Sequence, residues 1–281
     1  MNRKGFNGKA IYNPQGKAGE YSEWACNFYT GCSNNCDYCY CKRGFMSRVW
    51  SDKPQLKKCF KSEADALVVY EKELKLNLEA LRKSGLFFTF TSDPFVQENG
   101  ARETHMTAIL LALSYGVPVQ VLTKRADFSN SPYYNKILDK YKDLIAFGFT
   151  LTGHDELEPG ASSNQERVLA MKRLHQKGFK TFASIEPVVD FESSLKMIEA
   201  TVGDCDLYKV GLMSGSGVKY DRLDCFSFVD HVHTLLWMDK NNAKVYWKES
   251  VRKLVDNNYI TNPGYPMAVG ADYDIFGRVE V

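Results

Sequence analysis

Apolar residues recur along the chain at two spacings, and the change from one spacing to the other predicts alternating helices and strands. After Ser62, apolar positions step by three or four residues until Ser84 and Gly85, which is typical of a capped helix with one buried face. A short continuous apolar run follows over 86–90 and is typical of a buried strand. The pattern therefore predicts a helix followed directly by a buried strand.

The same alternation continues to residue 247. The helix predicted over 164–177 has the clearest limits, because Ser163 and Glu166 form a capping pair and Gly178 ends it. We predict further helices over 104–114, 132–141, 193–202 and 226–238, and further strands over 24–29, 119–123, 145–151, 181–185, 206–210 and 244–247. Seven strands with six crossovers result.

Strands that alternate with helices are usually parallel with right-handed crossovers, so we predict an α/β fold, either a doubly wound sheet or a barrel. No Pro/Gly/Ser-rich linker divides the sequence. We therefore predict one domain over 1–281, with a core of about 24–250, an N-terminal extension over 1–23 and a C-terminal extension over 251–281. Both architectures place their chemistry just after the carboxyl ends of the strands.

Composition places the chain among folded globular proteins. With 44% hydrophobic residues, 20 Gly and 9 Pro in 281 residues, a mainly disordered or fibrous chain is excluded. No apolar run approaches the roughly 18 residues of a membrane span, and the N-terminal sequence lacks the apolar core of a signal peptide. We expect a cytoplasmic protein without membrane association, whose 8 cysteines are buried hydrophobes or ligands.

Three cysteines are spaced as metal ligands on the loop after the first predicted strand. Cys32, Cys36 and Cys39 form a C-x3-C-x2-C motif. A cubane iron–sulfur cluster has four irons, so three thiolates leave one iron open for another ligand. Structural zinc normally takes four ligands, often from two C-x2-C pairs, and here only Cys41 offers a nearby fourth thiolate, across a sharp turn. The spacing thus leaves a cluster, zinc and inert thiols as the alternatives.

This motif, with the aromatic Tyr38 before its last cysteine, resembles that of the radical S-adenosylmethionine (SAM) enzymes. The resemblance implies a [4Fe-4S] cluster held by the three cysteines, with the fourth iron bound by the amino and carboxylate groups of SAM. It further implies reductive cleavage of SAM to a 5′-deoxyadenosyl radical that abstracts hydrogen from a substrate. The implied fold is a partial (β/α)6-type TIM barrel, and the implied partner is an electron donor of the flavodoxin or ferredoxin type.

Shorter segments resemble the spore photoproduct lyase-like branch of that superfamily. They are 91–95 (TSDPF), 121–124 (VLTK) and 158–161 (EPGA), while 184–187 (SIEP) and 245–249 (VYWKE) are also similar to phage-associated proteins of unknown function. Together the matches span roughly residues 24–250. They are short, so they indicate a branch and not a substrate.

Several residues at the predicted strand ends are candidates for binding SAM. The resemblance assigns the carboxylate of SAM to Lys124, for which an exposed lysine is the alternative. Ser92 and Asp93 are expected to accept from the amine or ribose, although a plain turn also explains Asp93 before Pro94.

The remaining cofactor candidates come from loops and strand ends. Thr150 and Thr152 offer hydroxyls to the ribose, though β propensity alone explains a strand threonine. Tyr38 and Tyr40 are expected to present backbone and ring to the adenine. Arg167 is a candidate for the SAM carboxylate or for pairing with Glu158, with a surface position as the alternative.

Three residues are candidates for catalysis. Glu186 ends a predicted strand, and a carboxylate that faces a barrel interior is costly unless paired, so Lys248 is its expected partner or a ligand for an anionic substrate. Cys41 is the candidate hydrogen-atom donor, because a cysteine has this role in the spore photoproduct lyase family. The glycine-rich segment 211–217 resembles an anion-binding loop but lacks the P-loop lysine.

Charge is unevenly distributed along the chain. Residues 1–61 hold 11 basic and 4 acidic residues, a net charge of +7, which leaves 25 basic and 30 acidic residues and −5 for the rest. A basic segment is compatible with a nucleic-acid substrate and equally with a solvated face. The alternatives are radical modification of a peptide, nucleotide or small anion, and a zinc-stabilised nucleic-acid-binding protein without catalysis.

Overall fold

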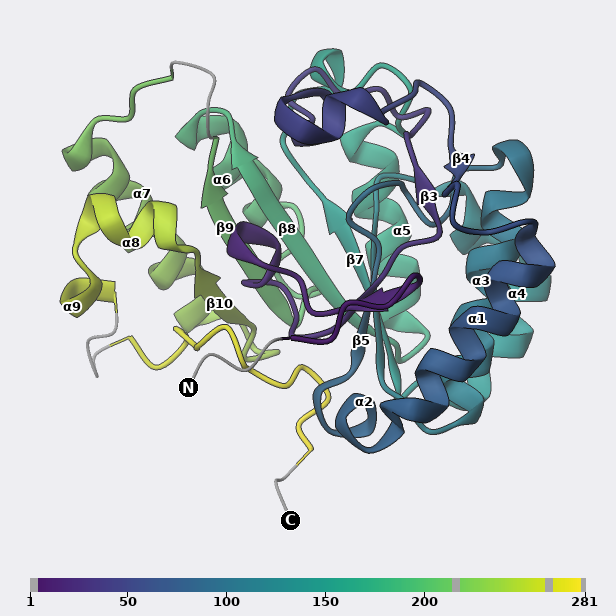
Figure 1. Cartoon of the computed structure of the whole chain (residues 1–281). Coiled ribbons are helices and arrows are strands. Elements are labelled where there is room, and N and C mark those ends of the chain that lie inside the picture. The colour runs from purple at the N-terminus through teal and green to yellow at the C-terminus, as the bar shows by residue number, and fades with distance from the viewer. Residues whose placement is uncertain (1–4, 214–217, 261–264, 279–281) are drawn as a thin grey trace. The chain divides into compact units, whose positions relative to one another are not determined.

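The computed structural model describes residues 5–213, 218–260 and 265–278 of the 281-residue chain (Figure 1). The chain forms two compact units. The first comprises residues up to Ile145 together with Glu158–Ala161, and the second comprises Ala146–Leu157 and the residues from Ser162 onward. The prediction of one domain over 1–281 stays a prediction.

In the first unit, parallel strands form the sheet that was predicted. Its order is β1 (Ile11–Tyr12), β2 (Ala25–Cys26), β5 (Leu86–Phe88) and β6 (Val119–Thr123), with β1 antiparallel at the edge and the others parallel. A second, antiparallel pair consists of β3 (Tyr29–Thr30) and β4 (Gln55–Leu56).

The strand predicted over 24–29 is therefore two short strands in two sheets. Asn27 separates them, because its side-chain Oδ1, and not its backbone, accepts a hydrogen bond from the Phe90 amide at 2.8 Å. The chain then leaves the parallel sheet and enters the cysteine loop through β3.

The helices of the first unit are α1 (Glu63–Leu76), α2 (Leu78–Ser84), α3 (Ala101–Ser114) and α4 (Pro132–Leu138), and α1 packs on α3 (Figure 1). The predicted cap is confirmed, since Ser62 accepts from the Asp65 amide at 3.2 Å. The single helix predicted after Ser62 is wrong: it divides at Asn77, whose φ of −113° leaves the helical region and whose side chain bonds back to the Glu73 carbonyl.

In the second unit, four parallel strands run in the order β7 (Ile145–Thr150), β8 (Lys180–Val188), β9 (Leu207–Leu212) and β10 (Lys244–Trp247). The capping box of α5 (Asn164–Gln176) is confirmed. The later helices are α6 (Phe191–Glu199), α7 (Arg222–Met238), α8 (Glu249–Val255) and α9 (Asn257–Ile260), of which α8 and α9 were not predicted.

Two helices of the second unit begin earlier than predicted, for the same physical reason. Asp190 and Asp221 cap α6 and α7 by accepting hydrogen bonds from backbone amides of the first turn. Aspartates satisfy the open N–H groups of a helix start, so the first turn forms before the apolar stripe begins. Strand β8 also exceeds its prediction and runs through Glu186 to Val188.

The α/β fold class is confirmed, with mainly parallel strands that alternate with helices. Over the ranges that the structure describes, no helix combines the length and hydrophobicity needed to cross a bilayer.

Candidate functional site

The three motif cysteines lie on one loop of the first unit, between β3 and a 3-10 helix over Tyr40–Lys42. All three are free thiols; Cys36 is buried, and Cys32 and Cys39 are half-buried. Two turn hydrogen bonds shape the loop, from the Asn35 amide to the Cys32 carbonyl at 3.3 Å and from the Cys39 amide to the Cys36 carbonyl at 3.2 Å. Within the described part of the chain, no three His, Cys, Asp or Glu side chains are grouped to hold a single metal ion.

Asp93 fixes this loop to the parallel sheet. Its buried carboxylate accepts four hydrogen bonds, all from within the first unit. One comes from the Asn34 side chain at 2.8 Å, one from the Thr123 hydroxyl at 2.7 Å, and two from the Lys124 and Phe95 amides at 2.7 and 2.9 Å. Asp93 therefore joins the cysteine loop to the carboxyl end of β6.

Gly160 holds the other side of the loop. Its amide donates to the Asn34 carbonyl at 3.1 Å, and its own carbonyl accepts from the Arg125 guanidinium at 2.8 Å. A Cβ atom at position 160 would lie 1.9 Å from the Ser33 carbonyl oxygen. Only glycine permits this approach of segment 158–161 to the cysteine loop.

Lys124 is a cation whose charge acts on all three predicted ligands. Its Nζ lies 5.5 Å from the centroid of the Tyr38 ring, and the Tyr38 hydroxyl donates to the Glu158 carboxylate. Burial raises the pKa values of Cys32 and Cys36, and the positive charge of Lys124 opposes this rise. A nearby cation therefore favours the thiolate forms that bind metal.

Cys39 and Cys41 share a hydrogen bond that distinguishes them. The Cys41 side chain lowers the pKa of Cys39 to about 6, while the same contact raises the pKa of Cys41. The Cys41 Sγ also lies 3.7 Å from the Phe90 carbonyl oxygen, which accepts from the Tyr40 hydroxyl as well. The contact therefore favours the thiolate form at Cys39 and the thiol form at Cys41.

Two buried oxygens around the cysteine loop have no hydrogen-bond partner among the described residues. They are Oδ1 of Asn34 and Oγ of Ser92. A buried oxygen without a partner costs free energy, and a ligand that donates hydrogen bonds would remove that cost. Together with three free thiols on one loop, these acceptors fit an iron–sulfur cluster with an amine-bearing ligand.

The remaining cofactor candidates lie in the second unit. Arg167 is 0% exposed, so the surface alternative is wrong. Its Nη1 donates to the Thr150 carbonyl at 2.6 Å and its Nη2 lies 3.6 Å from Asp155. Thr152 is also buried, and its hydroxyl accepts from the His154 amide at 3.2 Å. Arg167 therefore fixes the carboxyl end of β7, where both threonines lie.

Glu186 and Lys248 form the ion pair that the sequence predicted. The Lys248 Nζ lies 2.7 Å from Glu186 Oε2, and the two side chains are 2% and 20% exposed. Their predicted catalytic roles stay predictions. The glycine-rich segment reaches only to Met213 here, since residues 214–217 lie outside the described residues.

Three residues of these sites were missed by sequence reasoning. Asn34 lies between two motif cysteines, and nothing in the motif predicted its hydrogen bond to Asp93. Gly160 lies in the segment 158–161, for which only a resemblance was predicted and no contact with the cysteine loop. Lys209 is a buried lysine in β9. The sequence did contain a sign of this burial, because Lys209 stands within the apolar run of a predicted strand, where a lysine is uncommon.

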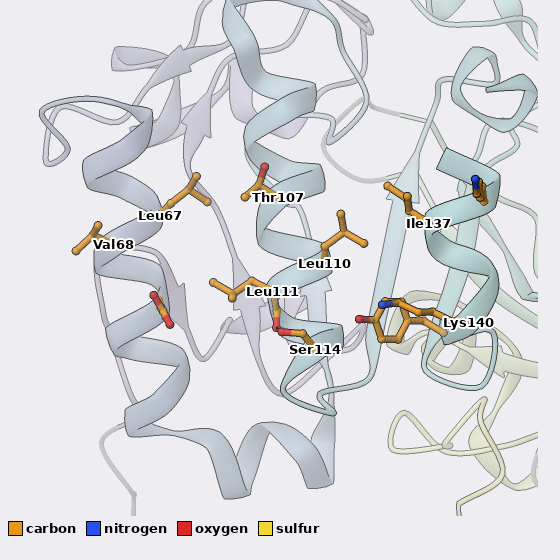
Figure 2. Close-up of a pocket in the computed structure, with 11 residues that line it drawn as sticks. Leu67, Val68, Thr107, Leu110, Leu111, Ser114, Ile137 and Lys140 are labelled. Carbon is orange, nitrogen blue, oxygen red and sulfur yellow. Dashed lines mark hydrogen bonds between the residues drawn. The ribbon is translucent and has the colours of Figure 1, made fainter. Parts of the chain in front are cut away.

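A groove on the first unit lies apart from these residues. It has a volume of about 730 Å³ and is lined by side chains of α1, α3 and α4, among them Leu67, Leu111 and Ile137 (Figure 2). Neither a cysteine nor any predicted cofactor residue lines it.

Comparison with known proteins identifies the superfamily. The family model of the radical SAM superfamily matches residues 26–205, which is more than half of the chain. None of the curated proteins matches. A solved structure of a spore photoproduct lyase variant superposes with a TM-score of 0.61 at 15% identity, over 88% of this chain and 81% of that one. Another variant, with bound AdoMet and dinucleoside spore photoproduct, gives 0.57 at 16% identity over 80% and 76%.

A second kind of structural neighbour is SuiB from Streptococcus suis. Its structure gives a TM-score of 0.55 at 12% identity, covering 80% of this chain but only 49% of SuiB. At these identities the likeness shows the fold, which is the partial barrel of the radical SAM kind that the sequence predicted. With the match to the family model, these findings establish that the chain belongs to the radical SAM superfamily.

Proposed function

We propose that Cys32, Cys36 and Cys39 hold the [4Fe-4S] cluster that this radical SAM enzyme uses. The observation that supports this best is a loop of three free thiols, fixed by Asp93 and Gly160 and bordered by unpartnered buried oxygens. When bound, the cluster and SAM supply reductive cleavage to a 5′-deoxyadenosyl radical, which abstracts hydrogen from the substrate.

Residues of the first unit would orient SAM. Lys124 would bind its carboxylate, and the Ser92 Oγ would accept from its amine or ribose, which would satisfy that buried oxygen. Asp93 already accepts four hydrogen bonds, so we propose that it positions the loop in addition to any contact with SAM. Tyr38 and Tyr40 would border the adenine.

Residues of the second unit would bind the ribose and substrate. The hydroxyls of Thr150 and Thr152 are proposed for the ribose, with Arg167 holding their strand end in place. Glu186 and Lys248 are proposed as catalytic groups that contact the substrate.

Cys41 is proposed as the hydrogen-atom donor to the product radical. Its thiol is buried directly after the proposed ligands, with Sγ 3.7 Å from the Phe90 carbonyl oxygen. Replacement of Cys41 by alanine would then leave SAM cleavage intact and block formation of the final product. In deuterated water the thiol exchanges its hydrogen for deuterium, so the wild type should transfer deuterium to the product and the variant should not.

A nucleic acid is the substrate that we favour. Basic side chains that follow the cysteine loop are exposed, including Arg43, Arg48, Lys53, Lys58 and Lys61. The related fold of spore photoproduct lyase is known with a bound dinucleoside. A peptide is the alternative, since a SuiB structure contains a precursor peptide, and a nucleotide or small anion is a further one. The zinc-stabilised alternative without catalysis loses its support, because the superfamily is enzymatic.

The electron donor and the cellular compartment of the enzyme are proposed from the chemistry of its superfamily. Radical SAM enzymes require a reductant, and we propose an electron donor of the flavodoxin or ferredoxin type. The free state of the cysteines agrees with a reducing compartment, for which we propose the cytoplasm.

Anaerobic reconstitution with iron and sulfide, followed by reduction and assay for 5′-deoxyadenosine, tests the proposal. We expect cleavage of SAM by the wild type and none by Cys36→Ala. Absence of product from the reconstituted wild type, or equal product from Cys36→Ala, would contradict it. Binding to a single-stranded oligonucleotide that weakens steeply with salt would support the nucleic-acid substrate, and salt-independent binding would oppose it.

A further inference from the structure

The imidazole of His154 lies between two carboxylates on the loop that follows β7. Its Nδ1 lies 2.6 Å from Oε1 of Glu156, and its Nε2 lies 2.6 Å from Oδ2 of Asp190. Glu156 belongs to the same loop, whereas Asp190 is the cap of α6. We call these three residues the histidine clamp. It links the carboxyl end of β7 to the start of the helix that follows β8.

Both contacts of the clamp require a protonated ring. A neutral imidazole has one N–H, so its other nitrogen would face a carboxylate oxygen with no hydrogen between them. The imidazolium has two N–H groups and donates to both carboxylates. Burial lowers the pKa of His154, but the hydrogen bonds and charges of Glu156 and Asp190 outweigh it, so the pKa is raised above its usual value.

The other charged side chains around the clamp have partners of their own. Asp155 of the same loop lies 3.6 Å from Arg167 of α5. On α6, Lys196 lies 2.7 Å from Glu192. Among the described residues, no third charged side chain pairs with His154. The protonation state of this one ring therefore decides whether the clamp holds.

The geometry of the clamp is that of two ion pairs and not of a metal site. A metal ion would lie between one ring nitrogen and both carboxylates. Here Nδ1 and Nε2, on different sides of the ring, each meet a different carboxylate. This agrees with the absence of any grouped single-ion ligands from the described part of the chain.

Thr152 is the residue that the clamp holds in place. Its hydroxyl accepts from the His154 amide at 3.2 Å, and its own amide donates to Oδ1 of Asn164 at 3.0 Å. Asn164 begins α5, so Thr152 is attached to α5 directly and to α6 through the clamp. Because the hydroxyl accepts in this contact, its proton can still be donated to a ligand at the end of β7.

The loop also lies directly against the first turn of α6. Gly153 has a φ of +75°, and a Cβ atom there would lie 3.0 Å from the Ser193 Cβ and 3.1 Å from the Ser193 carbonyl oxygen. Asp190 accepts from the Ser193 amide through Oδ1 at 2.7 Å, which leaves Oδ2 for His154. One carboxylate therefore both caps α6 and attaches the loop to it.

We propose that His154 is a positioning residue for SAM, which while protonated holds Thr152 in the place where its hydroxyl binds the ribose. The inference rests on the proposed function, which assigns the ribose to Thr152. The affinity gained through the clamp should be complete at low pH and should be lost as pH rises through the pKa of His154 in the folded protein. The competing explanation is a surface ion pair that stabilises the loop without any effect on SAM.

Equilibrium binding of SAM to the reconstituted, unreduced enzyme between about pH 6 and about pH 9 separates these explanations. SAM itself titrates, so the measured quantity is the ratio of the dissociation constants of variant and wild type at each pH. His154→Gln keeps a hydrogen-bonding group but no charge. We expect it to bind SAM at least threefold more weakly at the acidic end and equally at the alkaline end, a modest change because the ion pairs are partly exposed.

His175→Gln is the matched control. His175 lies at the other end of α5, 3.5 Å from Asp206, and its ratio should stay near one throughout. Asp190→Asn is the second variant, since asparagine still caps α6 but removes one negative charge from the clamp. It should lower the pKa of His154 and move the loss of SAM affinity to lower pH.

A ratio for His154→Gln that is independent of pH would overturn the inference, as would equal binding by this variant and the wild type at the acidic end. A loss of affinity that Asp190→Asn leaves at the same pH would also overturn it. Wild-type binding of SAM that is indifferent to the clamp would reject only the clamp. No binding of SAM by the wild type would reject the proposed function as well.

Discussion

The cysteine loop of the first unit and the lysine face of the second hold reactive side chains by opposite means. The lysine face is the group of Ser184 and Glu186 in β8, Lys209 in β9, Tyr246 in β10 and the adjoining Lys248. The loop has little regular structure and depends on a few hydrogen bonds, four of which converge on Asp93. The lysine face is part of a parallel sheet, and its position follows from strand register. Loss of one hydrogen-bonding residue should therefore disorganise the loop, whereas loss of the buried ammonium of Lys209 should stabilise the sheet.

The largest effect is expected for the ligands themselves. Alanine at Cys32, Cys36 or Cys39 should remove a thiolate ligand and reduce cluster content and SAM cleavage at least 100-fold, because the cluster keeps only two of its three protein ligands. Iron and sulfide analysis with the 5′-deoxyadenosine assay measures both. Cys59→Ala is the control, because Cys59 is exposed and outside the motif. Equal loss of the cluster from Cys59→Ala would contradict the assignment of the three motif cysteines as its ligands.

A paired comparison of two neighbours tests how the loop is held. Asp93→Ala leaves several donors without an acceptor and should lower the free energy of unfolding by at least about 3 kcal/mol. Ser92→Ala removes a hydroxyl that has no partner among the described residues, so stability should be kept while the KM for SAM rises. Urea unfolding and SAM kinetics measure the two effects. Equal stability of both variants would show that Asp93 does not organise the loop.

Loss of the Lys209 charge should raise the free energy of unfolding, whereas Asp93→Ala should lower it. The folded pKa of Lys209 is about 7, and the unfolded value is about 10.4, so the unfolded chain binds more protons between these values. Wild-type stability is therefore reduced as pH falls through this window. Lys209→Met should be more stable than wild type at pH 7, and the difference should shrink by about 3 kcal/mol towards pH 10. A pH-independent difference would contradict the burial argument.

The smallest expected effect is a pH dependence of stability that comes from one buried histidine in each unit. Burial lowers the pKa values of His105 in α3 and His233 in α7 to about 4. Between pH 6.5 and 4 the unfolded chain binds more protons, so stability falls as pH falls, by about 1 to 3 kcal/mol for each histidine. His105→Phe should remove its part of the decrease, measured by urea unfolding at pH 7 and 4.5. An unchanged pH dependence would contradict this assignment.

Much of the fold was predictable because hydrophobic periodicity reports burial directly. The strands over 119–123 and 244–247 were predicted to the residue. The failures arose where polar side chains replaced backbone interactions, as at Asn27 and Asn77. Such side chains end a strand or helix through contacts that an apolar pattern does not record.

The two sites differ in how much of them the sequence revealed. The cysteine motif is local, so its spacing and its resemblance to that of the radical SAM enzymes indicated the ligands. The lysine face joins residues of three strands, and only strand register shows that Lys209 lies beside Ser184 and Tyr246. The pairing of Glu186 with Lys248 was predicted from burial cost, but two features that permit it were not, the bulge in β8 and the absence of a side chain at Gly211 of β9.

Electron paramagnetic resonance of the reduced, reconstituted enzyme tests the central claim most directly. Three thiolates leave one iron open, so SAM should bind there and change the spectrum of the cluster. We predict the signal of a single reduced [4Fe-4S] cluster in the wild type, altered by SAM and absent from Cys36→Ala. A reduced cluster whose signal is unaffected by saturating SAM, or a wild type that binds no cluster, would contradict the account.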